Sequence, residues 1–453
     1  MMPAPTSHIP SGSYGEVAHL AYPVVLSMLA QTVMGVVDTL FMGWVSTEAQ
    51  AGLGLGSTLS WVVICFFFGS ITAVNTLVAQ HYGAGERSQC GRVAWQGLAL
   101  AALSTLVVWT VGVPLALRLP AIFSTDPAVA EIAGSYATIR IMGGVLGFVE
   151  VALASFMRGV GDTRTPMKVA LLMMVLNVPL NYWLVFGGLG VPALGPEGAA
   201  YATILAQGVG VAILIAVFLH PHFRHDYQTG WPQGGVGSLR TLLGVGLPIG
   251  AHWVLEMVGW TIFTLVVARF GAAPMAAHSI VLQVIHLSFM PGVGLSVAAT
   301  TLVGQAMGAR QPEVARRSGY ASLVLAVVFM GSMAPVFWLG GGVIAGLFTR
   351  DVVVQQLASR LFVSAAIFQV FDAAGMVSGG VLRGAALTRF PMLVSLASVL
   401  LVLLPGLWLF GVVLDGGVVG AWWAATLYMV AMGIVLFARV QWSPWERVGA
   451  IRG

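Results

Sequence analysis

The sequence predicts an all-α membrane protein in which twelve transmembrane helices form two six-helix bundles related by a parallel internal repeat. Three observations lead to this prediction. Hydrophobic residues make up 58% of the 453 positions and charged residues only 8%. Apolar runs long enough to cross a bilayer occur twelve times, and residues of the first half return 225 positions later. With a mean hydropathy of +0.92, the chain cannot cover a water-facing surface with polar side chains.

The twelve apolar runs are separated by short connections rich in Gly, Pro and charge. A helix needs about 20 residues, at about 1.5 Å each, to cross a hydrocarbon core of about 30 Å. Several runs exceed this length, which tilting or extension beyond the bilayer accommodates. We expect spans at residues 16–45, 52–82, 92–118, 128–157, 164–187, 197–220, 241–270, 275–307, 316–345, 353–383, 389–413 and 418–441.

The basic residues sort by side of the membrane. Of the 20 Lys and Arg, fifteen fall on alternate connections or near the C-terminus. By the positive-inside rule these connections and both termini face the cytoplasm, so the net charge of +4 reflects topology. No basic stretch with interleaved aromatics indicates a nucleic-acid partner. The fifteen are Arg87, Arg92, Arg158, Arg164, Lys168, Arg224, Arg240, Arg310, Arg316, Arg317, Arg383, Arg389, Arg439, Arg447 and Arg452.

The spans and connections define the expected domains. Residues 1–15 form a cytoplasmic tail without an apparent cleaved signal. Residues 16–220 form an N-lobe, 221–240 a cytoplasmic linker, 241–441 a C-lobe and 442–453 a second cytoplasmic tail. The polar segment around the linker carries His220, His222 and His225, which we interpret as solvated residues rather than a metal site.

A short segment displays the repeat. "FMRGVGDTRTPM" (156–167) returns as "VLRGAALTRFPM" (381–392). Because six spans is an even number, both halves enter from the same side, which gives a parallel repeat. The Arg-Gly pairs at 158–159 and 383–384 are expected on cytoplasmic loops, where Arg anchors at headgroups and Gly turns the chain.

Three aspartates of the repeat are expected at helix starts or in a loop. Asp126 and Asp351, at equivalent positions, are expected to be helix N-caps. Asp162, which becomes Leu387 in the second copy, is expected to be a solvated loop charge that costs little to lose.

Four intramembrane carboxylates are absent from the other copy of the repeat: Asp38, Glu150, Glu256 and Asp372. A charge at the bilayer centre costs roughly 2.5 to 3.5 kcal/mol on insertion scales and usually marks function. Each half has therefore acquired its own acidic chemistry on a shared frame. Glu150 lies near the cytoplasmic end of its span and is interpreted as structural.

Asp38 shares a helical face with Gln31, a candidate modulator. In "LNVPLNYW", Asn177 and Asn181 lie four residues apart on one face, and Pro179 frees a backbone carbonyl of the preceding turn. A carboxylate, two amides and a free carbonyl suit a small hard cation. Hydrogen bonding between helices explains the two Asn equally well.

Glu256 and Asp372 are the carboxylates of the second half. Burial raises the pKa of a carboxyl group and a nearby cation lowers it, so such groups can exchange protons for cations. His252 lies one turn before Glu256 and is a second candidate modulator, although a hydrogen bond between helices also explains it. Nearby apolar residues suit a cavity for organic cations, although packing or lipid contact also explains each of them: Trp253, Met257, Trp260, Met290, Phe368 and Phe371.

These motifs together resemble the multidrug and toxic compound extrusion (MATE) family over essentially the whole chain. The resemblance rests on "DTLFMG" in span 1, "VAQHYGAG" after span 2, "MRGVGDTRTPM" after span 4 and "PIGAHWVLE" in span 7. It implies an inner-membrane antiporter whose two lobes alternate access to a central cavity. Such a protein exports cationic drugs or metabolites against an inward sodium or proton gradient.

The resemblance also assigns site residues. Asp38, Asn177 and Asn181 match the family's N-lobe cation and proton site, with Thr203 as a further oxygen. Some relatives carry Asp where Asn181 stands, so this lobe is less acidic here. Glu256 and Asp372 match the C-lobe carboxylates of the sodium-driven bacterial branch, which favours Na⁺ at either cluster and leaves H⁺ open.

Other classes fit less well. A lipid-linked substrate flippase of the same superfamily is the main alternative, but it usually needs cationic residues in its cavity, whereas the intramembrane charges here are mostly acidic. No metal-ligand spacing or nucleophile motif supports an enzyme. A passive channel needs no coupling acids divided between lobes. We expect a monomer in the bilayer with no nucleic-acid partner and no cofactor beyond the coupling ion, Na⁺ or H⁺.

Overall fold

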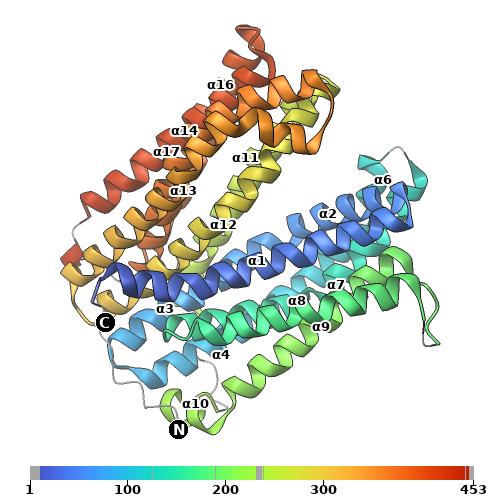
Figure 1. Cartoon of the computed structure of the whole chain (residues 1–453). Coiled ribbons are helices and arrows are strands. Elements are labelled where there is room, and N and C mark those ends of the chain that lie inside the picture. The colour runs from blue at the N-terminus through green and yellow to red at the C-terminus, as the bar shows by residue number, and fades with distance from the viewer. Residues whose placement is uncertain are drawn as a thin grey trace. The chain divides into compact units, whose positions relative to one another are not determined.

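The computed structural model describes residues 11–124, 126–188, 190–230, 237, 239–443 and 445–447. Nearly all of these are helical, and the β-structure among them is one isolated bridge between Gly188 and Val191 (Figure 1). Twelve helical stretches in the described chain are long and apolar enough to cross a membrane. The fold is therefore the predicted all-α membrane architecture.

The described part of the first half contains ten α-helices and one π-helical segment. Their bounds are α1 (Tyr14–Val45), α2 (Thr47–Ile71), α3 (Ala73–Gly83), α4 (Arg87–Val107), η1 (Val108–Gly112), α5 (Val113–Arg118), α6 (Pro120–Phe123), α7 (Pro127–Gly159), α8 (Arg164–Phe186), α9 (Gly195–Phe218) and α10 (Pro221–Tyr227).

The second half follows the same order. Its bounds are α11 (Arg240–Ala268), α12 (Ala272–Gly308), α13 (Pro312–Phe348), α14 (Val352–Gly384), α15 (Arg389–Ser398), η2 (Val399–Leu403), α16 (Leu404–Gly406), η3 (Leu407–Val413), α17 (Gly417–Gln441) and the 3₁₀ turn η4 (Trp445–Arg447). The span at 389–413 is thus interrupted by π-helical turns rather than being one continuous α-helix.

The helix ends reproduce the sequence repeat. The stretches Thr47–Gly83 and Ala272–Gly308 begin and end 225 positions apart. The same offset relates α7 to α14 at both ends and the first residues of α8 and α15. The duplication seen in the residues is therefore a duplication of helix lengths and connections.

The chain folds into two compact units. Unit 1 holds the described residues up to Val25, Gly83–Gly85 and the chain from Ala251 onward, whereas unit 2 holds Leu26–Tyr82 and Glu86–Gly250. Both α1 and α11 are therefore divided, and the two division points lie 225 positions apart, two residues after Pro23 and Pro248.

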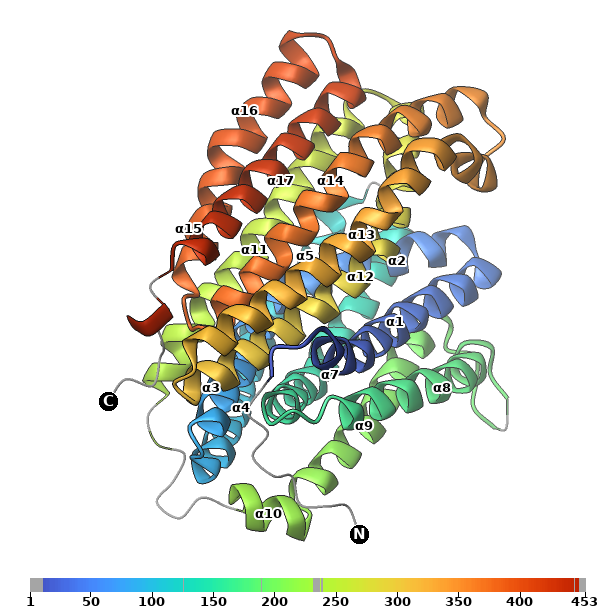
Figure 2. The same cartoon turned by 60° about the vertical axis from the view of Figure 1, so that its left-hand side comes forward.

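In unit 1 the central helix is α14, which packs against α12, α13 and α17 (Figures 1 and 2). Its core includes Val17, Leu20 and Ala21 from the start of α1. In unit 2 the corresponding central helix is α7, which packs against α2, α4 and α9. In each unit, the helix that ends in an Arg-Gly pair is thus surrounded by other helices of the same unit.

The Arg-Gly pairs lie in the last turns of α7 and α14, so their predicted position on loops is wrong. A Cβ on Gly384 would lie 2.7 Å from the Thr300 carbonyl oxygen, and one on Gly159 would lie 3.1 Å from the Asn75 carbonyl oxygen. Thr300 and Asn75 are themselves equivalent in the repeat. Both glycines are therefore needed for close helix packing rather than for turning the chain.

The capping predictions are confirmed for the two copied aspartates. Asp126 accepts a hydrogen bond of 2.9 Å from the Ala128 amide, and Asp351 accepts one of 2.8 Å from the Val353 amide. Asp162 is more than a dispensable loop charge, because its carboxylate accepts a hydrogen bond of 3.0 Å from the Thr165 amide at the start of α8. Leu387, its counterpart, offers no such acceptor.

The predicted linker is partly helical. Residues 221–227 form α10, in which Asp226 lies 3.7 Å from His222 and 3.1 Å from His225. Burial raises the pKa of Tyr227 in the same helix above its ordinary value. Residues 231–236 and 238 of the linker, 1–10 of the first tail, and 444 and 448–453 of the second lie outside the described residues.

Candidate functional site

Four polar side chains of unit 2 come together from three helices. Asp38 lies on α1, Asn177 and Asn181 lie on α8, and Thr203 lies on α9. Asn181 Nδ2 donates to Asp38 Oδ1 at 2.6 Å, and Thr203 Oγ1 donates to Asp38 Oδ2 at 3.2 Å. Asn177 Nδ2 donates to Thr203 Oγ1 at 3.3 Å. Residues separated by more than 140 positions in the sequence thus form one buried network around a carboxylate that is 6% exposed.

Two oxygens of this cluster have no hydrogen-bond donor. The Oδ1 atoms of Asn177 and Asn181 are buried and find no partner among the described residues. A buried carbonyl oxygen without a partner is costly and points to an unfilled acceptor position. Together with the Asp38 carboxylate and the Thr203 hydroxyl, these oxygens match the ligand preference of a small hard cation.

Other polar residues of unit 2 lie near Asp38 and Glu150. Arg140 on α7 is close enough to Asp38 to interact electrostatically with it. Gln31, predicted as a modulator of Asp38, instead places Nε2 3.5 Å from Glu150 Oε1. Glu150 also interacts electrostatically with Arg158. The structure therefore assigns Gln31 to the surroundings of Glu150.

In unit 1, His252 Nε2 lies 3.5 Å from Glu256 Oε1, in the one-turn arrangement that the sequence predicted. The Glu256 side chain is 36% exposed, whereas Asp372 is only 4% exposed. The two carboxylates are close enough to interact electrostatically, although they lie on different helices, α11 and α14. Asp372 Oδ2 is buried and has no hydrogen-bond partner in the part of the chain that the structure describes.

Arg383 was missed as a member of this region because it was assigned to a loop. It interacts electrostatically with Glu256 and donates a hydrogen bond of 2.9 Å from its Nη2 to Ser296 Oγ. The sequence did contain an indication of this role. The Arg-Gly pair is repeated, and a repeated Arg at the end of a span requires hydrogen-bond acceptors or a carboxylate nearby. Arg158 holds the equivalent position in unit 2.

The six apolar residues predicted to line a cavity differ in how deeply they are buried. Phe368 and Met290 are buried, and Phe368 meets Trp260 edge to face with ring centroids 5.9 Å apart. Trp253, Met257, Trp260 and Phe371 are half-buried. Phe368 thus belongs to the packed interior of unit 1, and cavity lining remains a prediction for this set.

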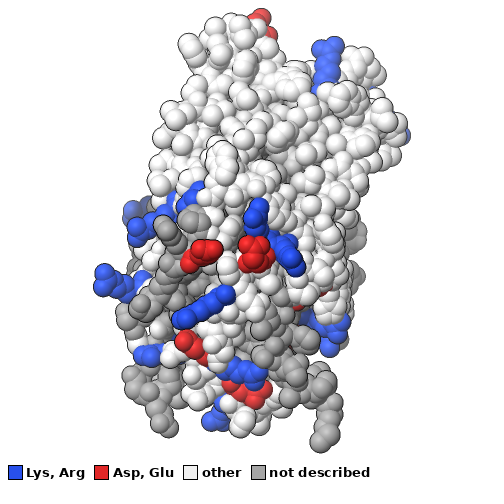
Figure 3. Space-filling view, turned by 90° about the vertical axis from the view of Figure 1, so that its left-hand side faces the viewer, with Lys and Arg blue, Asp and Glu red and all other residues white. Residues whose placement is uncertain are grey.

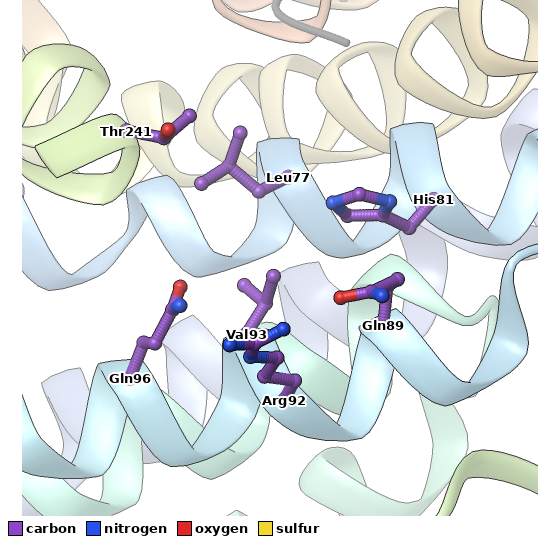
Figure 4. A pocket seen from close by; sticks show the side chains of 7 residues that line it. All are labelled: Leu77, His81, Gln89, Arg92, Val93, Gln96 and Thr241. Atoms are coloured by element: carbon purple, nitrogen blue, oxygen red, sulfur yellow. The ribbon is translucent and has the colours of Figure 1, made fainter. Parts of the chain in front are cut away.

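A pocket of about 240 Å³ lies elsewhere in unit 2, between α3, α4 and the start of α11. Figure 4 shows Gln96 and Val93 pointing from α4 toward Leu77 on α3. Its other lining residues are His81, Gln89, Arg92 and Thr241. None of the predicted site residues lines it, so it is separate from both carboxylate clusters.

The outer surface fits a bilayer. Large hydrophobic side chains are exposed on many helices, among them Leu339, Leu347 and Leu401, which are each at least 73% exposed. Most of the face in Figure 3 carries neither basic nor acidic side chains. Twelve helices long and apolar enough to cross a membrane, with apolar side chains on the outer surface, define the class: a multi-pass membrane protein.

Comparison with known proteins makes the assignment specific. A family profile described as MatE matches residues 23–183 and 248–409, so it recognises each copy of the repeat. The chain belongs to the MATE family of transporters, and it is not an enzyme.

Two curated relatives match almost throughout. The probable multidrug resistance protein NorM of Pseudomonas putida is 31% identical over 97% of this chain and 96% of that protein. The multidrug resistance protein MdtK of Yersinia pseudotuberculosis is 30% identical over 93% of this chain and 94% of its own length.

Solved structures agree on the fold. A transporter of the MOP superfamily from Pyrococcus furiosus superposes with a TM-score of 0.86 at 20% identity, covering 94% of this chain and 95% of that one. A multidrug resistance MATE family transporter in an outward-facing conformation gives 0.85 at 21% identity, covering 94% and 95%.

Proposed function

We propose that this protein is a secondary active antiporter that exports cationic organic compounds in exchange for inward Na⁺ or H⁺ by alternating access. The observation that carries the proposal is that each unit contains a buried carboxylate with acceptor oxygens that have no hydrogen-bond partner among the described residues. In unit 2 these oxygens are Oδ1 of Asn177 and of Asn181 beside Asp38, and in unit 1 the oxygen is Oδ2 of Asp372 itself. Relatives along the full length are named as multidrug resistance proteins.

The chemistry of coupling follows from desolvation. An ionised carboxylate that is removed from water is stabilised when a cation or proton binds to it, and that ion leaves only where water can replace it. Asp38, with Asn177, Asn181 and Thr203, offers one such position. Asp372 with Glu256 offers the other. An inward ion gradient then drives each cycle of drug export.

The remaining assignments complete the proposal. The protein resides in the inner membrane with both termini in the cytoplasm, acts as a monomer, and uses no cofactor other than its coupling ion. His252 modulates Glu256 through their contact. The half-buried aromatic residues Trp253, Trp260 and Phe371, with Met257, contact the organic cation during transport.

The test is uptake of a labelled organic cation into liposomes under imposed sodium or proton gradients, each applied separately. Asp372→Asn and Glu256→Gln should abolish gradient-driven transport with the protein still folded, and Asp38→Asn should impair it strongly. Asp415→Asn removes an exposed loop carboxylate and serves as the matched control. Full transport in all three site variants, or no response of the wild type to either gradient, would overturn the proposal.

A further inference from the structure

The pocket between α3, α4 and the start of α11 is lined by polar side chains that the proposed function does not use (Figure 4). On α4, Gln89, Arg92 and Gln96 follow one another at spacings of three and four residues, so they share one helical face. On α3, Leu77 and His81 lie one turn apart and line the opposite side. The pocket therefore brings together amide, imidazole and guanidinium groups, all of which can donate hydrogen bonds.

Close packing of α3 and α4 fixes the two sides of this pocket. The Cys90 thiol donates to the Val78 carbonyl oxygen at 3.6 Å. A Cβ on Gly97 would lie 2.5 Å from Val74 Cγ2. The pocket volume of about 240 Å³ lies below the roughly 300–1,000 Å³ typical of sites for drug-sized ligands. At about 30 Å³ for each water molecule it equals about eight waters, which is room for a phosphate and a small substituent.

Arg92 gives the pocket a positive charge. Among the described residues, which include every Asp and Glu of the chain, Arg92 has no carboxylate partner. Glu86, the acidic residue closest to it in sequence, instead lies 2.8 Å from His81 Nδ1. A Cβ on Gly237 would lie 2.5 Å from Arg92 Nη2, so the backbone of the linker passes beside the guanidinium. A guanidinium without a counterion, next to neutral donors, favours an anionic ligand.

The second half of the chain shows that this fold does not require polar residues at the pocket. Arg92 is retained 225 positions later as Arg317. The position of Thr241, at the start of α11, corresponds to Glu16 at the start of α1. The residues that replace His81, Gln89 and Gln96 are Ala306, Val314 and Ala321. Unit 2 alone thus surrounds the repeated Arg with hydrogen-bond donors and leaves out the acid.

The backbone around the repeated Arg is the same in both units. Gly12 and Gly237 are equivalent in the repeat, and both have a positive φ, of 71° and 74°. A Cβ on Gly12 would lie 2.8 Å from Arg317 Cβ. In unit 1 the Gly12 amide donates to the Glu16 carboxylate at 3.1 Å, which places a negative charge at the end of this segment. The shared frame therefore holds an Arg and a Gly, and the anion-binding chemistry is specific to unit 2.

We propose that this pocket binds the phosphate group of an anionic ligand, with Arg92 as its charged anchor and the amides of Gln89 and Gln96 as neutral donors. A guanidinium pairs with two phosphate oxygens at once, and this geometry distinguishes phosphate from a monatomic anion. Leu77 and Val93 line the same pocket and suit the organic part of a phosphate ester. The inference goes beyond the proposed antiport and does not depend on it.

The position of the pocket suits the headgroup region. It lies beside the connection between α3 and α4 and at the start of α11, on the side that the distribution of basic residues predicts to be cytoplasmic. Basic pockets between transmembrane helices on that side bind the headgroups of anionic lipids. A soluble phosphate carries the same recognised group, so the experiment includes both sources.

Binding of two probes to the purified full-length protein in detergent tests the proposal. One probe is radioactive inorganic phosphate, and the other is short-chain phosphatidylglycerol, with phosphatidylcholine of equal chain length as its reference. We expect saturable binding of at least one probe and a higher melting temperature in its presence. Arg92→Gln should weaken this binding at least about tenfold. Arg92→Lys keeps the charge but loses the paired donors, so its affinity should lie between those of Arg92→Gln and wild type.

Two further variants use the repeat as a guide. The double variant Gln89→Val with Gln96→Ala introduces the residue types that unit 1 carries at these positions, and it should weaken binding at least about threefold. It also decides the question should Arg92→Gln fail to fold. Arg317→Gln is the matched control, because it removes the equivalent Arg from unit 1, and it should bind both probes as the wild type does.

Each outcome supports or overturns the inference. Binding of phosphatidylglycerol alone supports it with a lipid headgroup as the source, and binding of inorganic phosphate supports it with a soluble source. No saturable binding of either probe by the wild type overturns it. Binding that Arg92→Gln leaves unchanged, or that Arg317→Gln weakens equally, also overturns it. None of these measurements uses a sodium or proton gradient, so such a failure would leave the proposed antiport intact.

Discussion

Asn181 and Asp38, on helices separated by 143 positions in sequence, are joined by a hydrogen bond of 2.6 Å from Asn181 Nδ2 to Asp38 Oδ1. This contact orients the amide with Nδ2 toward the carboxylate. The Asn181 Oδ1 atom has no hydrogen-bond partner in the described chain. The Asn therefore stabilises the carboxylate and also offers an oxygen of its own. A purely structural amide pair would not need that second feature.

Replacing Asn181 with Ala should disable the unit 2 cluster. The change leaves Asp38 Oδ1 buried without its donor, which costs about 1–3 kcal/mol. We expect gradient-driven transport at equal protein level to fall at least about tenfold. Thr39→Ala, which alters the exposed neighbour of Asp38 on α1, should transport normally. Equal transport in both variants would mean that the contact has no role in the cycle.

A single carboxylate should serve at either position 150 or position 31. Gln31 holds the position in unit 2 that Glu256 holds in unit 1, and Glu256 acts on Arg383 as Glu150 acts on the equivalent Arg158. Each unit thus places a carboxylate near its copy of the repeated Arg, but in unit 2 that carboxylate comes from α7 and in unit 1 from α11. Removing the Glu150 carboxylate is destabilising because the half-buried Arg158 charge then loses its compensation.

We therefore expect Glu150→Gln to reduce the yield of folded protein and its melting temperature in detergent. Adding Gln31→Glu in the same chain returns a carboxylate beside position 150 and should recover at least half of both losses. Gln31→Asn in the Glu150→Gln background is the control, since it changes the side chain without adding charge. No difference between the two double variants would contradict compensation of Arg158 by charge.

Gly384→Ala should destabilise the protein. The added Cβ would lie 2.7 Å from the Thr300 carbonyl oxygen and 3.0 Å from Val303 Cβ, so α14 and α12 would have to separate. Overpacking of this kind costs about 1–3 kcal/mol. The control is Gly342→Ala in α13, where the nearest neighbour of the new Cβ would be Ser359 Oγ at 3.8 Å.

Thermal unfolding in detergent measures both glycine variants. Gly342→Ala should be neutral or slightly stabilising, because Ala favours a helix over Gly by up to about 1 kcal/mol. An equal melting temperature for Gly384→Ala and wild type would show that the helices adjust to the methyl group.

Asp351→Ala should lower stability by about 1 kcal/mol through the loss of an N-cap. The Asp351 carboxylate accepts from the amides of Val353 and Val354 at the start of α14. Asp351→Asn keeps an acceptor oxygen and should retain most of the stability. Because Asp351 is exposed, transport per folded molecule should be unchanged in both variants, which separates capping from ion coupling.

Local features of this protein were predictable because local physics decides them. The twelve spans follow from hydropathy and length, and the two caps follow from an Asp placed directly before a helix. The repeat predicted that the two halves are the same six-helix unit before any contact was known. Arg158 and Arg383 were misplaced because Gly and charge usually mark loops, whereas here close packing requires the glycines inside helices.

The candidate site could be predicted only in part. Intramembrane carboxylates are visible in the sequence as rare charges in apolar runs, and Asn177 and Asn181 are visible as a pair on one face. Gln31 was paired with Asp38 because both share a helix, but its hydrogen bond reaches Glu150 on another helix.

The sequence by itself determined that this chain is a duplicated, twelve-span membrane protein and which rare charges it places within the membrane, because hydropathy, period and spacing are properties of neighbouring residues. Only the tertiary structure decided that Asp38 contacts residues of α8 and α9, and that Glu150 lies beside Gln31. Those contacts join residues far apart along the chain, and helix packing rather than local sequence selects them.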